Sequence, residues 1–411
     1  MLPKTREVPE YDLLSLAFRQ NPYPTLHRMR EEDPIHYSPQ LKAWLVTRYD
    51  DVLAGLQNPA ISADRISPRM LQFPEHARPE FEPLTRILSK WALMMDRPDH
   101  TRFRTLINKA MTRPIIMSFR PLIQRIVNQM LDAAQAQGGL DVMTELALPL
   151  PLYVVSELIG APQETFEQLK RCAFDIVSFF GTPPHTYLPT ASVAMRSVED
   201  TVELLREAVR ARQRSPRGDL ISNLLAAREY GETFDEEEII ATCLMMIFAG
   251  FETTQNLLGN GILLLLQHPE QYELLRRDSA LMRNAVDEML RYESPVQRLS
   301  RMASADLMLR GRTIRQGELL FFMASAANRD PAVFAEPDRF KVNRGSSSQH
   351  IAFGHWIHTC PGSTLAHLEG SIVFGELCRR GLRMKLHRDQ PPQWLENLSI
   401  RSLKSLLVNF I

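Results

Sequence analysis

The sequence predicts a mainly α-helical fold with small β-sheets. Apolar residues recur with helical spacing along most of the 411-residue chain, and strand-like segments are short. The most apolar segment, Ile239 to Leu266, is interrupted by Glu252, Gln255, Asn256 and Asn260, which favours a buried helix over a membrane span. Neither a repeat nor a linker divides the chain, so we expect residues 1–411 to form a single domain.

Composition argues against several classes of protein. The 48 Lys and Arg residues balance the 48 Asp and Glu residues, which favours neither nucleic acid nor an anionic membrane as a partner. The four cysteines are scattered without a C-x-x-C pair, as in a reduced, cytoplasmic protein. The first residues lack the apolar core of a signal peptide. We therefore expect a cytoplasmic monomer that binds no membrane.

The elements follow in order from local patterns. Ile35 to Val46 predicts a hairpin, and Asp306 to Phe322 predicts further strands with turns at Gly311 and Gly317. Ile61 to Pro98 contains five prolines and is expected to be irregular until Pro98 begins a helix. A second proline-rich segment, Gly181 to Pro189, separates two predicted helices. Such segments serve either as binding loops or as plain connections.

One segment, FGHWIHTCPGSTLAHLEG, places a cysteine directly before a helix. Pro361 is suited to the first helical position, and the free N–H groups of that helix would stabilise a thiolate at Cys360. Phe353 could shield the sulfur, while Gly354 and Gly362 would let the backbone approach a flat group. The alternative is an inert buried cysteine.

The central helix carries polar residues in its middle. Capping-box patterns at Thr233 and Asp235 predict its start, and the helix should end near Leu266, before His268 and Pro269. Its centre reads AGFETTQN. Thr253 and Thr254 could simply bond back to the carbonyls of residues 249 and 250. Alternatively, Glu252 and Thr253 form an acid–alcohol pair for proton delivery.

These two segments together resemble the cytochrome P450 family. The cysteine loop matches F-G-x-G-x-H-x-C-x-G at Phe353, Gly354, His358, Cys360 and Gly362. The central helix matches A-G-x-D/E-T at Ala249, Gly250, Glu252 and Thr253. The resemblance implies the P450 fold, with haem b (iron protoporphyrin IX) between the two helices and Cys360 as the iron ligand.

One loop position departs from the family pattern. Trp356 stands where the family usually has glycine, so the tryptophan must either adopt a less favourable backbone conformation or displace the loop. This puts the usual geometry of the loop in doubt. Trp356 could cover the sulfur or contact an electron donor, beside cations at Arg102, Lys109 and Arg113.

Further matches extend the resemblance over nearly the whole chain. Glu288 and Arg291 resemble the buried E-x-x-R pair, although an exposed ion pair is the simpler interpretation; Arg339 or Arg344 would complete that network. The resemblance also implies haem-propionate contacts from four residues: His100, Arg104, Arg301 and His358.

The resemblance implies a haem-thiolate monooxygenase that inserts one oxygen atom of O2 by hydroxylation or epoxidation. Electrons would come from a separate ferredoxin and ferredoxin reductase. One alternative is a haem-thiolate oxidase performing coupling, desaturation or peroxide-driven chemistry; another is a non-catalytic haem sensor or recruitment module.

Substrate contacts are expected beside Val296 and in residues 61–98 and 166–189. These two segments show no charge cluster. A mostly apolar intermediate of secondary metabolism or a xenobiotic, free or carrier-tethered, is the expected substrate.

Overall fold

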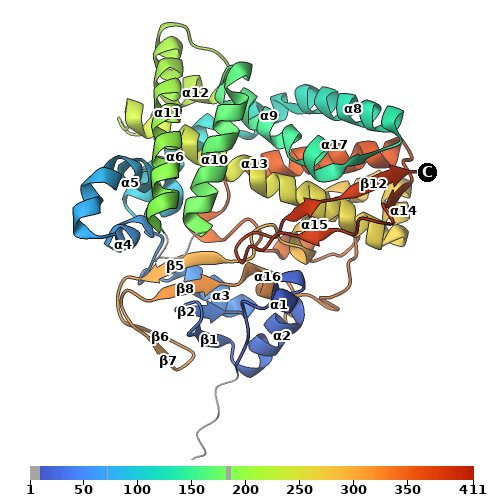
Figure 1. The fold of residues 1–411 in the computed structure, drawn as a ribbon, viewed down its shortest axis with the longest axis horizontal. Helices are drawn as coiled ribbons and strands as arrows, with labels where there is room; N and C mark the ends of the chain where they lie inside the picture. Colours follow the sequence, from blue (N-terminus) through green and yellow to red (C-terminus); the bar gives the residue numbers. More distant parts are fainter. Residues whose placement is uncertain (1–9, 72, 182–186) are drawn as a thin grey trace, which may run out of the picture.

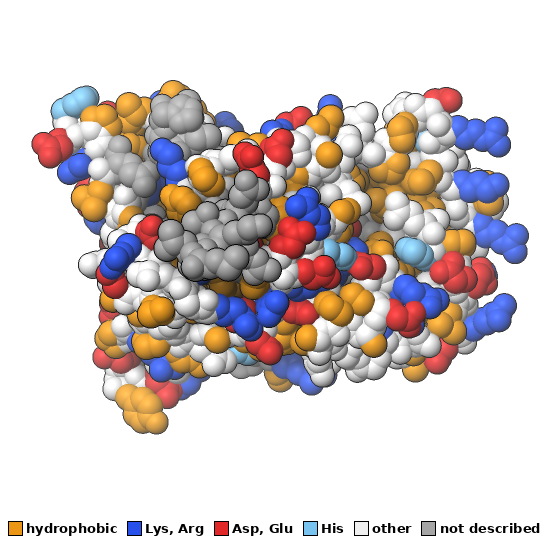
Figure 2. All heavy atoms as spheres, turned by 90° about the horizontal axis from the view of Figure 1, so that it is seen from below, with side chains coloured by type: hydrophobic (Ala, Val, Ile, Leu, Met, Phe, Trp, Pro, Cys, Tyr) orange, Lys and Arg blue, Asp and Glu red, His pale blue; other side chains and the backbone are white. Residues whose placement is uncertain are grey.

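Helices form most of the molecule, and a five-stranded sheet lies at one side (Figure 1). The computed structural model describes residues 10–71, 73–181 and 187–411. Seen from below, acidic, basic and apolar side chains alternate over much of this face, and several Lys or Arg side chains line its right-hand edge (Figure 2). No helix within the described ranges is both long enough and apolar enough to cross a membrane.

The helix α13 (Glu236–Gln267) runs through the centre of the helical part (Figure 1). Its N-terminus is a capping box in which the Asp235 side chain accepts from the Glu238 amide, while the Glu238 side chain accepts from the Asp235 amide. The predicted helix is therefore confirmed, with Asp235 rather than Thr233 as its cap. Four helices pack along it: α9 (Pro149–Ile159), α10 (Phe166–Gly181), α11 (Tyr187–Arg214) and α17 (Ser363–Arg379).

The sheet contains the strands predicted at 35–46 and the end of the region predicted at 306–322. Its order is β1 (Ile35–Ser38), β2 (Ala43–Val46), β8 (Leu319–Phe322), β5 (Leu299–Ala303) and β3 (Ile61–Ser62). β1 and β2 form the expected hairpin, with Ile35 opposite Val46, and β2 runs parallel to β8. A separate hairpin, β6 (Leu307–Leu309) and β7 (Arg312–Ile314), turns at Gly311, whose φ is 75°.

The prediction that 61–98 is irregular was wrong for most of that segment. It folds into α4 (Ile66–Leu71), a 3₁₀ helix (Glu75–Phe81), α5 (Glu82–Ser89) and a 3₁₀ turn (Ala92–Met94). Proline is tolerated in the first turn of a helix, and Pro83 occupies that position in α5. The segment is therefore largely helical despite its prolines, and its helices are short. The expected break between two helices at 181–189 falls largely on 182–186, outside the described residues.

The other elements complete the framework around α13. The remaining helices are α1 (Leu16–Gln20), α2 (Tyr23–Glu32), α3 (Tyr49–Gln57), α6 (Asp99–Ala110), α7 (Arg113–Ser118), α8 (Arg120–Gln137), α12 (Leu220–Ala226), α14 (Pro269–Arg277), α15 (Met282–Tyr292) and α16 (Ala324–Ala327). The remaining strands are β4 (Gly139–Asp141), β9 (Met384–Leu386), β10 (Gln393–Trp394), β11 (Leu403–Ser405) and β12 (Leu407–Phe410). Pro98 directly precedes α6, as predicted.

Candidate active site

Cys360 lies in the turn that leads into α17. Its amide donates to the carbonyl of Phe353 at 2.8 Å, and the Ser363 amide donates to the Cys360 carbonyl at 3.5 Å. Burial raises the pKa of the Cys360 thiol, whereas backbone hydrogen bonding from Gly362 and Ser363 and the Arg104 guanidinium lower it. The helix begins at Ser363, so Pro361 precedes the helix instead of occupying its first position as predicted. The backbone at the start of this helix nevertheless acts to lower the thiol pKa, as expected.

The loop before Cys360 turns through two left-handed residues. Gly354 has a φ of 73°, and a Cβ there would lie 3.2 Å from the carbonyl oxygen of His358. Trp356 has a φ of 58°, which is the less favourable backbone conformation considered for it. Its indole ring is 41% exposed and lies under the Arg97 guanidinium, with the ring centroid 4.8 Å from Cζ. Gly362, in contrast, has a φ of −85° and needs no special conformation.

Five cationic or potentially cationic side chains lie around this loop, two of them buried and three half-buried, and none forms an ion pair with a carboxylate among the described residues. Asp96 nevertheless acts electrostatically on His100 and Arg301, and Asp64 on Arg65. His100 and Arg104 come from α6, Arg301 from β5 and His358 from the cysteine loop. The rings of His100 and His358 lie 4.2 Å apart, and His100 Nδ1 is buried without a hydrogen-bond partner. Sequence analysis missed Arg65, which lies near Arg301 and His358.

The electrostatics of this cluster favour an anionic occupant. Burial and the neighbouring guanidinium groups of Arg301 and Arg69 lower the pKa of Arg65 to about 9. Burial, together with nearby Arg104, lowers the pKa of His100 to about 4. Across the described residues, no carboxylate lies within ion-pair distance of Arg65, Arg104 or Arg301. Uncompensated buried cations are costly, so a bound anion would stabilise them.

The centre of α13, and not only its two ends, reaches accessible space. Ala249 is exposed and Glu252 and Thr253 are partly exposed, although most of the helix is buried. The hydroxyls of Thr253 and Thr254 donate to the carbonyls of Ala249 (2.9 Å) and Gly250 (3.1 Å). This is the back-bonding that we considered as the structural alternative. Burial raises the pKa of Glu252 to about 7, so its carboxyl group can both hold and release a proton near neutral pH.

Gly250 has a packing role that the motif did not reveal. A Cβ at this position would lie 2.8 Å from Cγ2 of Val155, so glycine lets α9 approach α13 closely.

An aromatic group lies near the centre of α13. Phe248 contacts Trp91 and Phe180, with ring centroids 4.9 Å and 5.7 Å away. These aromatic side chains were not predicted, because they come from three segments that only the fold brings together. Val296 forms an isolated bridge with Ile400 and remains partly exposed.

Glu288 and Arg291 form a fully buried pair on α15. Arg291 Nε donates to Glu288 Oε2 at 2.7 Å, and both side chains have 0% exposure, so the exposed-pair interpretation is wrong. Arg344 Nε lies 3.1 Å from both oxygens of Glu288. The side chain of Arg339 pairs instead with Glu336, and only its carbonyl joins the network. Arg344 is therefore the residue that completes the network.

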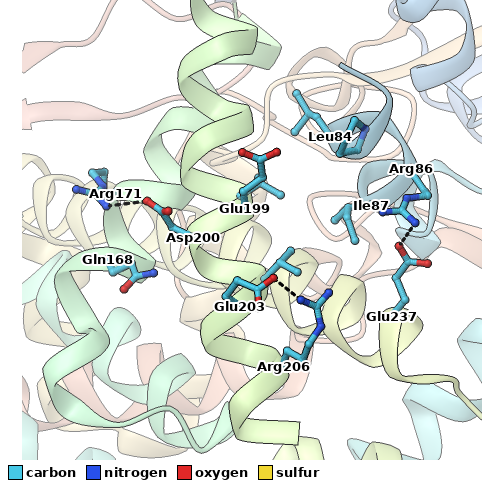
Figure 3. Close-up of a pocket in the computed structure, with 13 residues that line it drawn as sticks. Leu84, Arg86, Ile87, Gln168, Arg171, Glu199, Asp200, Glu203, Arg206 and Glu237 are labelled. Carbon is cyan, nitrogen blue, oxygen red and sulfur yellow. Dashed lines mark hydrogen bonds and ion pairs between the residues drawn. The ribbon is translucent and has the colours of Figure 1, made fainter. Parts of the chain in front are cut away.

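A surface pocket of about 680 Å³ lies between α5, α10, α11 and the start of α13 (Figure 3). Its charged side chains pair with one another across these helices, for instance Arg171 with Asp200 at 3.8 Å and Arg86 with Glu237 at 3.2 Å. Its lining on α5 and α10 falls within 61–98 and 166–189, where substrate contacts are expected, but it includes none of the individually named site residues. This pocket is separate from the residues around Cys360 and Thr253.

Comparison with known proteins identifies the family. The family model "Cytochrome P450" matches residues 73–407. The chain belongs to the cytochrome P450 family. The curated relative "Polyketide biosynthesis cytochrome P450 PksS" of Bacillus subtilis (strain 168) is 36% identical over 95% of this chain and 96% of the relative. Cytochrome P450 107B1 of Saccharopolyspora erythraea is 38% identical over 98% of each. A structure of P450BioI with a hexadec-9Z-enoic acid ligated acyl carrier protein has a TM-score of 0.87 at 34% identity, covering 96% of this chain and 99% of that one.

This P450 is thus a monooxygenase whose family uses haem b. The residues present fit that group. Haem b bears two propionates, and the cluster of His100, Arg104, Arg301, His358 and Arg65 offers charges and donors for carboxylates while forming no ion pair of its own among the described residues. The Arg104 guanidinium and the backbone of Gly362 and Ser363 lower the pKa of the Cys360 thiol, which suits a thiolate ligand.

Proposed function

We propose that this P450 hydroxylates or epoxidises a mostly apolar biosynthetic intermediate, with Cys360 as the iron ligand and Glu252 and Thr253 as the proton-delivery pair. We further propose that residues 1–411 act as one cytoplasmic haem domain. The observation that carries the site assignment is the place of Cys360 in the turn into α17, where the Arg104 guanidinium and the backbone of Gly362 and Ser363 act to lower the pKa of its thiol. Haem b supplies the iron centre at which molecular oxygen is activated.

The cationic cluster would hold the cofactor in orientation. Arg301, Arg65 and Arg104 would neutralise the propionates, and the buried Nδ1 of His100 would gain a partner. Phe353 would cover the sulfur side of the loop, because its carbonyl already binds the Cys360 amide. Gly354 keeps this turn tight through its positive φ.

Protons would reach the site along the exposed centre of α13. The Thr253 hydroxyl donates its hydrogen to Ala249, so its oxygen can accept a hydrogen bond from a water molecule in the site. Glu252, with a pKa near 7, would supply the proton from the position directly before Thr253. The back-bonded geometry of Thr253 is therefore compatible with a role as an acceptor.

Electrons would come from a separate ferredoxin and ferredoxin reductase. Two of the three cations expected at the docking face have internal partners: Arg102 pairs with Glu238, and Lys109 with Glu229. Arg113 has no ion pair among the residues that the structure describes. We propose that Arg97, stacked on Trp356, contributes the cationic contact that Arg102 and Lys109 do not.

The proposal about the substrate rests on three aromatic side chains near the centre of α13 and on the relatives of this chain. Phe248, Trp91 and Phe180 would present an apolar surface near Thr253. One relative is named for polyketide biosynthesis, and one similar structure holds an acyl chain ligated to a carrier protein. Titrating one acyl chain in its free and carrier-ligated forms, with the haem spectral shift as readout, would decide how the substrate arrives.

The function is tested by spectroscopy and turnover together. The reduced carbon monoxide complex should show a thiolate-type band, and Cys360→Ala should abolish it. With surrogate ferredoxin and reductase, NADPH consumption should yield oxygenated product from a shift-inducing substrate. A thiolate-type band that persists in Cys360→Ala would overturn the ligand assignment. Product formation that requires peroxide in place of NADPH and O2 would favour the oxidase alternative.

A further inference from the structure

Arg298 is a half-buried arginine that faces away from the predicted haem site. It directly precedes β5, and Arg301 lies three residues later in the same strand. Successive side chains of an extended strand point to opposite faces, so residues 298 and 301 lie on opposite faces. The packing agrees with this alternation, because Arg298 Cζ lies 3.7 Å from the ring centroid of Phe321, and Phe321 pairs with Ser300 across the sheet. Arg298 therefore belongs to a place separate from the cluster around the cysteine loop.

A pocket of about 260 Å³ opens beside Arg298. Its apolar residues are Leu14, near the N-terminus, and Leu398, and Ser399 lines it next to Leu398. The segment that carries Ser399 is joined to the residues before β5, because the Gln297 amide donates to the Ser399 carbonyl at 2.8 Å. Pockets for drug-sized ligands measure about 300–1,000 Å³, so this pocket suits a smaller molecule.

The side chains of this pocket have hydrogen-bond donors to spare. Arg298 Nε donates to Ser399 Oγ at 3.0 Å, while Nη1 and Nη2 donate to no group in the described part of the chain. The Ser399 hydroxyl accepts in this bond and keeps its own hydrogen to donate. Asn397 Oδ1 accepts from the amides of Ser399 (2.8 Å) and Ile400 (3.1 Å), and Asn397 Nδ2 donates to none of the described residues. Three side chains can thus donate to a ligand in one pocket.

The charge of Arg298 has no counterion within the described ranges. Burial alone lowers its pKa to about 10, with no contribution from a neighbouring carboxylate. The carboxylate that lines the pocket, Glu396, pairs with Arg19 instead. A half-buried cation without a counterion is unfavourable, and a guanidinium group can donate two parallel hydrogen bonds to one carboxylate. The pocket is therefore suited to an anion with planar oxygens.

We propose that this pocket binds the carboxylate of a small organic acid. The charged group of the acid meets Arg298 and Ser399, and its short chain lies against Leu14 and Leu398. Because Arg298 faces away from Arg301, this acid is a separate ligand and not the molecule oxidised at the haem. The inference depends neither on the iron ligand nor on the proposed substrate.

The test measures the binding of hexanoate to the haem-loaded enzyme by calorimetry. Hexanoate should bind with a dissociation constant of about 1 mM, as suits a ligand of this size, whereas its neutral analogue hexanamide should not bind measurably. Arg298→Gln should weaken the binding of hexanoate by about tenfold. Glu396→Gln, which removes the carboxylate of the pocket, should strengthen it by about threefold. Arg283→Gln, at an exposed arginine on α15, is the matched control and should leave it unchanged.

Two further measurements keep the test decisive. Ser399→Ala should weaken binding by about threefold, and it takes the place of Arg298→Gln if that variant does not retain haem. The haem absorption spectrum should stay constant during the titration, because the pocket lies on the other face of β5.

Four outcomes would overturn the inference. They are no binding of hexanoate, equal binding of hexanoate and hexanamide, parental affinity in both Arg298→Gln and Ser399→Ala, and a haem spectral shift that saturates with the calorimetric dissociation constant. The last would place the acid at the haem. A failure of the proposed function would appear separately, in the spectrum of Cys360→Ala.

Discussion

The Thr253 hydroxyl donates to the Ala249 carbonyl one helical turn earlier, at 2.9 Å, in the exposed centre of α13. The oxygen of this hydroxyl therefore acts toward the site as an acceptor. Thr253→Ala should keep haem binding but reduce product per NADPH by about tenfold or more, with a matching rise in peroxide, because proton delivery is impaired. Product and peroxide assays measure both quantities.

Thr254 provides the matched control for this variant. It makes the same type of bond, to Gly250, but is only 4% exposed. Thr254→Ala should leave coupling near that of the parent. If coupling is unchanged in Thr253→Ala, then Thr254, ordered water or the substrate supplies the proton path.

Glu252 should impose a pH dependence on turnover. With a pKa of about 7, its carboxyl group is mostly protonated at pH 6 and mostly ionised at pH 8. Coupled product formation should therefore fall as pH rises through 7. Glu252→Gln should be slow and nearly flat across this range, as a series of coupled assays at fixed ionic strength would show. A parental pH profile retained in Glu252→Gln would remove Glu252 from the proton path.

The Glu252 carboxyl group should also make the free energy of unfolding depend on pH. Because burial raises the pKa of Glu252 from 4.5 to about 7, the folded chain binds the proton more tightly than the unfolded chain. Glu252 should thus reduce stability increasingly as pH rises between those values. Glu252→Gln should be more stable than the parent above pH 7, by about 1–2 kcal/mol after discounting for partial exposure, and equal to it below pH 4.5. Thermal unfolding at both pH values tests the sign.

Trp356→Gly should preserve fold and haem while changing the electron-donor face. Glycine adopts the left-handed backbone at lower energy, but the stacking on Arg97 is lost. An exposed cation–π contact contributes about 0.5–1 kcal/mol, so ferredoxin binding should weaken by about two- to fivefold, or the midpoint potential should shift. Arg97→Gln, which removes only the cation, is the control. Parental values of both quantities in Trp356→Gly would make Trp356 a tolerated replacement without function.

Arg344 and Arg339 should differ sharply in their effect on stability. Arg344→Ala removes one of the two guanidinium partners of a carboxylate with 0% exposure, together with hydrogen bonds to three backbone carbonyls, and should destabilise the fold by about 3 kcal/mol. Arg339→Ala keeps the backbone carbonyl that joins the network and removes a side chain that is 70% exposed, so its effect should stay within about 0.5 kcal/mol. Chemical denaturation of the two variants measures the difference. Similar losses would contradict the assignment of Arg344.

The predictions that held depend on local signals. The Asp235–Glu238 capping box and the 35–46 hairpin are each specified by residues close in sequence, and both were confirmed. The family resemblance was confirmed because its motifs recur in a set order along the chain. Periodicity alone would have identified a long buried helix without indicating why its centre is polar.

What sequence analysis missed depends on tertiary contacts. Arg65 is one of many arginines until the fold places it beside Arg301 and His358. The sequence alone does not decide whether Arg339 or Arg344 reaches Glu288. Only the path of the backbone directs Arg344 toward that carboxylate. Proline spacing could not reveal that α4 and α5 accommodate their prolines in or near their first turns.

The buried cations around Arg301 also have a consequence for how the protein is made. A newly synthesised chain must bring Arg65, Arg104 and Arg301 together against their mutual repulsion before a propionate neutralises them. Ligand binding to the native state alone stabilises it by mass action. Haem supply in the cell should therefore set how much of this enzyme matures and how much is degraded, so that iron limitation would lower its abundance without any change in transcription.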